Sequence, residues 1–348
     1  SLKADFLEAL DHHGDYLMEH HAFFGNHLIT EMLALLKLSL LRPEAPNQGI
    51  WKSYALNKLD KEYRKQFYNE GAHKELSSHY QRVVLLNFQL LLELLEQTND
   101  TESLNLWKPR IDRMWEYFWA IQKPDGTAPL NNDSDHEDIQ ALFSRHNQHE
   151  GSAPTQTQYF AQAGQVIFRS DSTETRPLWA FFDIGPRGTD HQHEDFLHLS
   201  LSLGKANFLV DNGRYTYTPG PWREYFQGPR SHNILQINGR RDRPKPKSSN
   251  SALPNSGFLS TDEYDAAWGM TRFNNDWGTE IAQWQRSVIQ FPNQILLVLD
   301  HLITFRPREL EGYWHFAPEV HFHNKDGQLF AQNGDETLKI SHMATQDS

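Results

Sequence analysis

The sequence predicts an α+β protein with two domains. A helical domain is expected over residues 1–150, linker included, and an antiparallel β-sandwich over residues 151–348. Three observations carry this prediction. Apolar residues follow a helical period up to about residue 122. Turn-forming residues then dominate residues 123–157. From about residue 158 onward, apolar residues alternate with the period of two that is typical of strands.

Each helix rests on a local pattern. Leucine-rich segments at 28–41 and 83–95 are apolar on most sides, which predicts two buried helices. An amphipathic helix is expected between them, at about 56–67, and an aromatic-rich helix at about 102–121. Asp100 precedes that last helix as part of a start signal. Helices that follow one another without strand signals indicate a domain in which helix packs on helix.

The linker and the strands complete the prediction. Turn formers at 124–126, 131–135 and 151–154 place the domain boundary near residue 150. Strands are expected at 165–169, 178–184, 197–203, 207–211, 233–238, 287–291, 294–300, 311–316 and 328–331. Long antiparallel strands with Gly, Asn and Pro at the corners are typical of a β-sandwich.

Composition excludes several classes of protein. The 348 residues carry a net charge of −12, which argues against general nucleic-acid binding. No run approaches the roughly 18 uncharged apolar residues that a membrane span needs. The absence of cysteine excludes disulfides, thiolate metal sites and a cysteine nucleophile. No signal peptide is visible, and because both ends look cut, we expect a fragment or a processed form.

The densest polar segment is Asp190–Asp195. In extended chain, His191 and His193 point to the same side, which suits a metal or a shared polar cleft. Asp211 ends an apolar strand and His232 opens another. His193, Asp211 and His232 together make a sufficient nitrogen and oxygen ligand set for zinc. The alternative is surface imidazoles and a turn aspartate, because ligands far apart in sequence have no fixed spacing.

Three further residues stand at helix starts. Asn26 precedes the first leucine-rich helix, where a helix cap is the alternative to a functional role. His27 follows it and could equally be solvated. Tyr80 lies in the first turn of the next leucine-rich helix, where a packed aromatic residue is the alternative.

A basic stretch interrupts the acidic chain. It holds Arg223, Arg230, Arg240, Arg241, Arg243, Lys245 and Lys247. This reversal of charge marks either the landing place of an anion or a solvated loop. Aromatic residues interleave with it, namely Tyr215, Tyr217, Trp222 and Tyr225. Aromatic faces beside cations suit sugar rings that bear acids.

Taken together, these motifs resemble the heparinase II/III-like polysaccharide lyases, including the related alginate lyases, over about residues 20–320. Gly25-Asn26-His27 is similar to the family's active-site Asn/His motif. The segment from Glu70 to Tyr80 is similar to its catalytic tyrosine motif. The most specific match is the signature of the β-domain: His191-x-His193-x-Asp195, then Leu209-Val210-Asp211-x-Gly213-x-Tyr215-x-Tyr217, then Arg230-Ser231-His232-Asn233.

The resemblance implies an α/α toroid of helical hairpins, here partial, followed by an antiparallel β-sandwich, with the active site in the cleft between them. Family members usually carry more helices upstream and more strands downstream, which agrees with a fragment. The implied reaction is β-elimination on a uronic-acid-containing polysaccharide, either heparan sulfate/heparin-like or alginate-like. The resemblance also implies a periplasmic or secreted location and, often, a structural zinc.

The resemblance implies four catalytic residues. Asn26, with His27 or His191, would hydrogen-bond the uronate carboxylate and stabilise the charge that develops on it. Tyr80 would donate a proton to the leaving oxygen. The base stays open between neutral His27 or His191 and a tyrosinate at Tyr80. For anti elimination, the candidates on the opposite face are a histidine and Tyr225.

Supporting roles and rival functions follow. The expected substrate-binding residues are Glu75, Tyr225, Arg223 and Arg230. Zinc would hold the strands of its ligands and position His191, without acting as a Lewis acid. One rival is a glycoside hydrolase, with carboxylates such as Glu75, Asp190 and Asp195 flanking the bond. The other is a non-catalytic protein that binds acidic polysaccharide.

Overall fold

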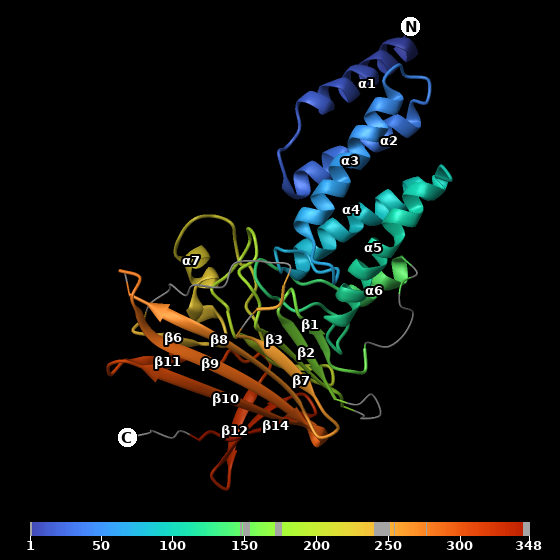
Figure 1. Ribbon diagram of the computed structural model, residues 1–348. Helices are drawn as coiled ribbons and strands as arrows, with labels where there is room; N and C mark the ends of the chain where they lie inside the picture. Colours follow the sequence, from blue (N-terminus) through green and yellow to red (C-terminus); the bar gives the residue numbers. More distant parts are fainter. Residues whose placement is uncertain are drawn as a thin grey trace. The chain divides into compact units, whose positions relative to one another are not determined.

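A computed structural model describes residues 2–146, 148, 154–170, 176–239, 251–253, 255–275 and 277–343. The basic residues expected at 240–247 therefore lie outside the described residues. The chain forms two compact units, one of Ser1–Glu75 with Tyr80–Phe118 and one of Leu76–His79 with Trp119–Ser348. Figure 1 labels the elements of both. No helix in the described ranges combines the length and the apolar run that crossing a bilayer requires.

Five helices account for the first unit, and their sequences explain them. They are α1 (Leu2–Glu19), α2 (Gly25–Leu41), α3 (Gln48–Gln66), α4 (Ser78–Gln97) and α5 (Thr101–Ala120). The leucine-rich helix α2 is buried along most of its length, as its sequence predicts. Around Phe88, an aromatic core gathers Tyr63, Phe67 and Trp107. Such rings bury large apolar areas and lock the helices that carry them.

The loop between α3 and α4 is held by backbone contacts that only glycine allows. Gly71 has a φ of +88°, and a Cβ there would lie 2.1 Å from the backbone oxygen of Arg113. Buried Gln81 donates through Nε2 to the carbonyl oxygens of Gly71 and Met114, at 3.0 and 3.3 Å. Its Oε1 accepts from the backbone N–H of His73 at 2.7 Å. The chain leading to Tyr80 is therefore fixed to α5.

We predict that Gly71→Ala destabilises the protein by about 1–3 kcal/mol, because the left-handed φ and the approach of Arg113 both penalise a side chain. Gly49→Ala on α3 is the matched control, since a Cβ at Gly49 meets nothing within 4 Å. Urea unfolding of both variants measures the difference. Equal stability of the two variants would contradict this account of the loop.

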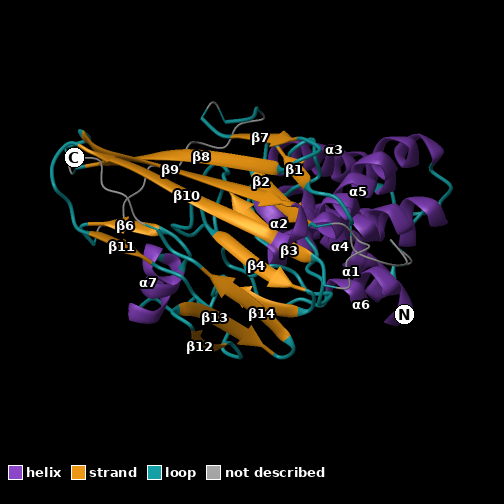
Figure 2. Cartoon of the chain, turned by 90° about the horizontal axis from the view of Figure 1, so that it is seen from below, coloured by secondary structure: helices purple, strands orange, loops and turns teal. Residues whose placement is uncertain are grey.

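The second unit is built on antiparallel sheets. A five-stranded sheet runs β1 (Gln158–Phe160), β2 (Gln165–Arg169), β3 (Leu178–Asp183), β4 (Leu199–Leu203), β5 (Ala206–Leu209). A four-stranded sheet contains β7 (Gly257–Ser260), β8 (Asp265–Asn274), β9 (Glu280–Phe291) and β10 (Ile295–Thr304) in the order β10-β9-β8-β7. Figure 2 shows β8, β9 and β10 as long neighbouring strands. One hydrophobic core draws buried residues from both sheets, among them Phe168, Phe182, Trp284 and Val288. The predicted β-sandwich is confirmed.

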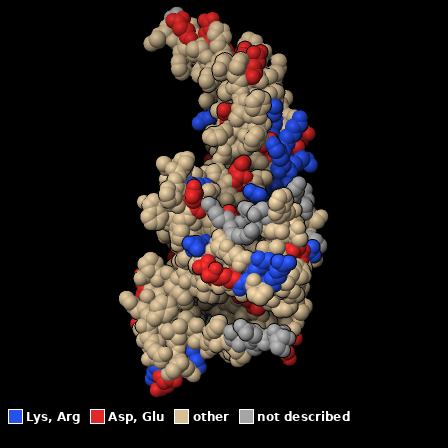
Figure 3. All heavy atoms as spheres, turned by 90° about the vertical axis from the view of Figure 1, so that its left-hand side faces the viewer, with Lys and Arg blue, Asp and Glu red and all other residues tan. Residues whose placement is uncertain are grey.

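Shorter elements complete this unit. They are α6 (Ile139–Arg145), α7 (Pro221–Gln227), the 3-10 turns η1 (Pro229–Ser231) and η2 (Pro292–Gln294), a pair of β6 (Leu235–Ile237) with β11 (Leu310–Gly312), and a sheet of β12 (His321–Lys325), β13 (Gln328–Asn333) and β14 (Glu336–Ile340). The strand prediction missed β1, β7, β8, β12 and β14. The segment expected as a strand at 287–291 is only the end of β9. On the face shown in Figure 3, basic and acidic side chains lie next to one another instead of forming a field of one sign.

Candidate active site

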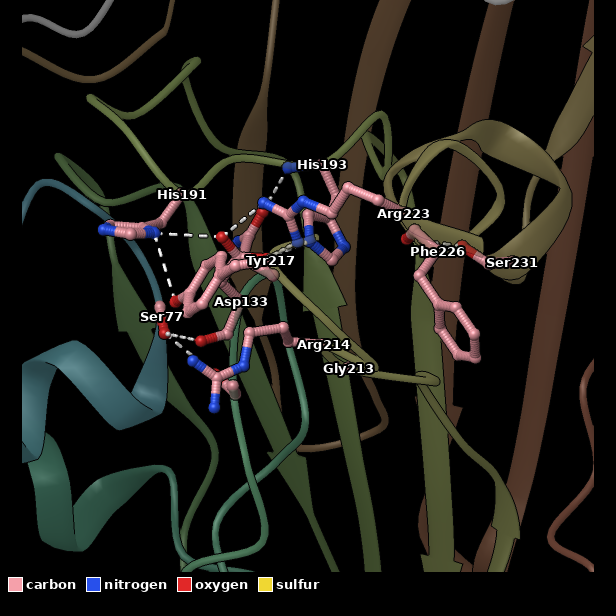
Figure 4. Close-up of polar contacts among 12 residues, drawn as sticks. Ser77, Asp133, His191, His193, Gly213, Arg214, Tyr217, Arg223, Phe226 and Ser231 are labelled. Carbon is pink, nitrogen blue, oxygen red and sulfur yellow. Dashed lines mark hydrogen bonds and ion pairs between the residues drawn. The ribbon is translucent and has the colours of Figure 1, made fainter. Parts of the chain in front are cut away.

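Asp133 is the centre of a buried polar cluster in the second unit (Figure 4). It is 0% exposed, and its Oδ2 lies 2.9 Å from Nδ1 of His191. Its Oδ1 lies 2.8 Å from Nε2 of His193. Arg223 forms a two-pronged ion pair with the same carboxylate, at 2.7 Å between Nη2 and Oδ2. Burial acts to raise the pKa of Asp133, but the three donors outweigh it and hold the pKa well below its usual range.

The backbone brings these side chains together from segments about 60 residues apart. His193 donates its backbone N–H to Oδ1 of Asn132 at 2.8 Å. Asp133 donates its backbone N–H to the carbonyl of His191 at 3.2 Å. Asn131 and Asn132 both donate to the carbonyl oxygen of Leu76, at 2.6 and 2.9 Å. Turn-forming Asn and Asp residues thus build a rigid support for the two histidines.

His191 is oriented for proton transfer. A carboxylate only accepts hydrogen bonds, so the proton of the neutral ring lies on Nδ1 toward Asp133, and Nε2 carries the lone pair. The side chain remains 26% exposed. This is the arrangement by which a carboxylate fixes the tautomer of a histidine base.

Tyr217 lies between two guanidinium groups. Arg214 is 4.3 Å and Arg223 5.1 Å from the centroid of its ring. Its hydroxyl lies 3.4 Å from Nδ1 of His191. Arg214 also pairs with Asp135. A phenol held beside a histidine and two cations can donate to, or accept from, a polar substrate group.

A second, fully buried cluster lies behind the first. Each of three residues offers one atom that could bind a metal ion, and these atoms all lie within 4.8 Å of one another. The residues are His198, Asp211 and His232. Nδ1 of His232 is 3.2 Å from Oδ1 of Asp211, and Nε2 of His198 is 3.6 Å from Oδ2. Burial lowers the pKa of His198 to about 4, which keeps this ring neutral. Burial opposes the ionisation of Asp211, but the neighbouring histidines lower the pKa of its carboxyl group.

Two family models match this chain. The model described as "Heparinase II/III N-terminus" matches residues 2–159, and the one described as "Heparinase II/III-like, C-terminal" matches residues 152–347. The chain belongs to the heparinase II/III family. The two models meet at residues 152–159, near the expected boundary at 150, whereas the compact units divide at Phe118 and Trp119.

Relatives of this heparinase II/III chain are similar at low identity. It is 24% identical over 276 residues to a heparin-sulfate lyase of Bacteroides thetaiotaomicron, covering 67% of this chain and 39% of the relative. A heparin-sulfate lyase of Pedobacter heparinus is 24% identical over 260 residues, with 68% and 39% covered. The chain therefore spans well under half the length of these curated relatives.

Solved structures show the same fold. The heparan sulfate lyase HepC of Pedobacter heparinus matches with a TM-score of 0.76 and 20% identity, over 95% of this chain and 54% of that one. A mutant of that enzyme matches with a TM-score of 0.78, also at 20% identity and with the same coverage. The predicted fold class, a helical region followed by a β-rich region, is confirmed by this likeness.

The heparinase II/III motifs of the first unit fall on helix starts. Asn26 is half-buried in the first turn of α2, but the cap position is Phe24, so Asn26 is not the helix cap. His27 is exposed and Tyr80 is half-buried in the first turn of α4. Glu75, expected to bind substrate, is only 7% exposed, and its Oε2 lies 3.9 Å from Nδ1 of buried His73.

In the second unit, the structure sorts the predicted residues. His191, His193 and Arg223 meet at Asp133. Arg230 is not part of this cluster. Its Nη2 lies 3.5 Å from Oε2 of Glu311. Among the described residues, the group within ligand distance consists of His198, Asp211 and His232, so it shares Asp211 and His232 with the predicted zinc set but has His198 where His193 was expected.

Three residues of the clusters were missed from the sequence: Asp133, Tyr217 and His198. Asp133 stood in a run that indicates a turn, and His198 stood inside an apolar strand pattern. Tyr217 was noted as one of several aromatic residues beside a basic stretch and as the last residue of the β-domain motif, but it was given no role at the site. Two adjacent Asn residues before Asp133 were the available signal, because such residues hold backbone segments as well as turns.

Proposed function

We propose that this chain is part of a polysaccharide lyase that cleaves heparan sulfate or heparin by β-elimination. Family membership and the printed activity of the relatives support this proposal. The observation that carries it is the His191–Asp133 pair, in which the carboxylate leaves the lone pair on Nε2 of a partly exposed imidazole. The reaction needs such a base to remove the proton alpha to the uronate carboxylate.

The other residues then take supporting roles. Arg223 neutralises Asp133 and holds it in place, so that the carboxylate orients His191 without becoming a proton donor itself. The hydroxyl of Tyr217 is close enough to His191 to help orient the ring. Asn26 and His27 keep the role that their motif implies, stabilisation of the substrate carboxylate. Tyr80 keeps the role of proton donor to the leaving oxygen.

A substrate panel tests this function. Heparan sulfate, heparin, alginate, hyaluronan and chondroitin are incubated with the protein, and the ultraviolet absorbance of a new C4=C5 double bond is followed. We expect product from heparan sulfate or heparin first. Reducing ends without this absorbance would indicate the rival glycoside hydrolase. Of its candidate carboxylates, Glu75 and Asp195 are only 7% and 1% exposed, whereas Asp190 is exposed. Binding without cleavage would indicate the non-catalytic rival.

We also propose a structural zinc beside the buried cluster, held by His193, Asp211 and His232. Nδ1 of His193 is buried and has no hydrogen-bond partner among the described residues, while its Nε2 lies 2.8 Å from Oδ1 of Asp133. A carboxylate on one ring nitrogen and a metal on the other is the usual setting of a histidine ligand. The ring of His193 lies 5.4 Å from that of His232, closer than the 5.8 Å between His198 and His232.

The hydrogen bonds of His198 support leaving it out of this ligand set. Its Nδ1 accepts the backbone N–H of Asn233 at 3.0 Å, so the proton of the neutral ring is on Nε2. Nε2 lies 2.8 Å from Oγ of Ser200 and has no lone pair to offer. His198 therefore supports the neighbouring Asp211 instead. When bound, zinc would cross-link the segments that carry His193, Asp211 and His232. This would help to keep His191 in place, because His191 is two residues from His193.

Metal content tests this assignment. We expect one equivalent of zinc in protein purified without chelator, and a lower melting temperature after chelation. His193→Ala and His232→Ala should lose the metal, whereas His198→Asn should keep it. Elemental analysis by mass spectrometry gives the answer. Zinc lost from His198→Asn but kept in His193→Ala would assign the site to His198, Asp211 and His232.

The expected location in the periplasm or outside the cell also stays a proposal, because a polymeric substrate is met there. Cell fractionation of the full-length protein tests it.

A further inference from the structure

The short helix α7 exposes an aromatic surface that no role so far explains. We call it the aromatic platform and define it by Tyr215, Trp222, Tyr225 and Phe226. Tyr215 is 63% and Trp222 62% exposed, and Tyr225 is 38% exposed. None of the seven residues of α7 is buried. Exposed aromatic residues gathered at one place, in a chain as polar as this one, mark an interaction site.

The rings of the platform are ordered by mutual contacts. Tyr215 stacks on Phe226 with 5.3 Å between centroids and 18° between planes. Trp222 lies 5.8 Å from Tyr215 and 6.4 Å from Phe226. Tyr225 meets Phe226 edge-on at 5.3 Å. Such packing fixes the rings in advance, so that binding to them costs little conformational entropy.

The platform is joined to the Asp133 cluster through its own backbone. Arg223, between Trp222 and Glu224, reaches Asp133 with its guanidinium group. The carbonyl of Gln227 at the end of α7 accepts the backbone N–H of Glu194 at 2.9 Å. Ser231 Oγ donates to the carbonyl of Phe226 at 2.8 Å. Figure 4 shows the Phe226 ring pointing away from the cluster that Arg223 contacts.

We infer that the aromatic platform is a carbohydrate subsite, which stacks the pyranose face of a sugar residue distant from the bond that is cleaved. This inference rests on the proposed function. A polysaccharide extends on both sides of its reacting residue, and α7 carries one residue into the cluster and three aromatic residues outside it. The aliphatic face of a pyranose ring fits an aromatic face. The expected substrate-binding role of Tyr225 becomes part of this subsite.

The subsite predicts a dependence on substrate length. Trp222→Ala should raise KM for long heparan sulfate chains about 10-fold, because one stacking surface is lost. It should leave kcat, and both constants on the shortest cleavable oligosaccharide, within about 2-fold. Trp277→Ala is the matched control, since Trp277 is 91% exposed and is not one of the platform residues. Equal KM values of the two variants on long chains would overturn the inference.

Binding without turnover separates this inference from the proposed function. Quenching of tryptophan fluorescence by heparin oligosaccharides is measured for wild type, Trp222→Ala and Trp277→Ala at low and high salt. Weaker binding by Trp222→Ala alone supports the subsite even if no lyase activity is found. Binding that is equally strong in all three proteins and falls equally with salt would overturn it. Electrostatic attraction of the heparin sulfates would then be sufficient to explain the binding. A change of oligomeric state in Trp222→Ala, seen by sedimentation, would also overturn it, since the occupant would be a second copy of the chain.

Discussion

His191→Gln should lower kcat on heparan sulfate by about 10²- to 10⁴-fold, the usual contribution of a general base. Glutamine retains a polar group of similar size that can still hydrogen-bond Asp133, but it cannot take up a proton. KM should therefore change little. Steady-state kinetics, read by the absorbance of the unsaturated product, measure the effect.

The control for this prediction is His301→Gln on β10, because His301 is exposed and belongs to neither polar cluster. Its kinetic constants should equal those of the wild type. Circular dichroism and zinc content of His191→Gln should also equal those of the wild type, which shows that the loss is chemical. A variant within threefold of wild type would remove His191 from the mechanism.

Arg286→Met should destabilise the second unit by about 2–4 kcal/mol, since the carbonyls of buried Leu197 and Asn233 and the partly exposed carboxylate of Asp300 all lose their hydrogen-bond donor. Arg286 is 1% exposed and lies 4.9 Å from the centroids of both Trp284 and Trp314. Nε and Nη2 donate to the carboxylate of Asp300 at 2.8 and 2.9 Å. Nη1 donates to the carbonyls of Leu197 and Asn233 at 2.9 and 2.6 Å.

Those two carbonyls adjoin His198 and His232, so Arg286 also ties together the segments around the buried cluster. Arg286→Lys keeps the charge but cannot reproduce the planar fork, and it should recover only part of the loss. The matched control is Arg272→Met on β8, whose exposed pair with Glu280 should contribute less than about 1 kcal/mol. Thermal and urea unfolding measure all three. Equal stability of Arg286→Met and Arg272→Met would refute this role.

Helices α2 and α4 were predictable because their own sequences are apolar on most sides. The leucine-rich segments became α2 and α4 with shifts of a few residues at the ends. Strand β8 was not, because its inward positions include small residues such as Ala267 and Gly269. A Cβ at Gly269 would lie 2.6 Å from Leu197, so the size of that residue is set by a segment about 70 residues away. Such a requirement leaves no local period in the sequence.

The site, like the fold, was predictable only where the signal lies in the local sequence. His191 and His193 were recognisable from their spacing, and Arg223 from its basic surroundings. Asp133 was not, because its partners are 58 and 60 residues distant and a run of Asn and Asp reads as a turn. Likewise, the hydrogen bond from Asn233 to His198, on which the proposed zinc ligand set depends, joins residues that are 35 positions apart in the sequence.

The position of Asp133 limits how this protein can be dissected. The C-terminal family model begins at residue 152, so an expression clone cut there would omit Asp133. His193 and Arg223 would then lack the acceptor that holds them, and Asn132 could no longer accept the backbone N–H of His193. A clone that begins before Trp119 keeps all of these partners. The module that can be moved between proteins of this family is thus longer than its β-strands, and it includes the connecting segment that precedes them.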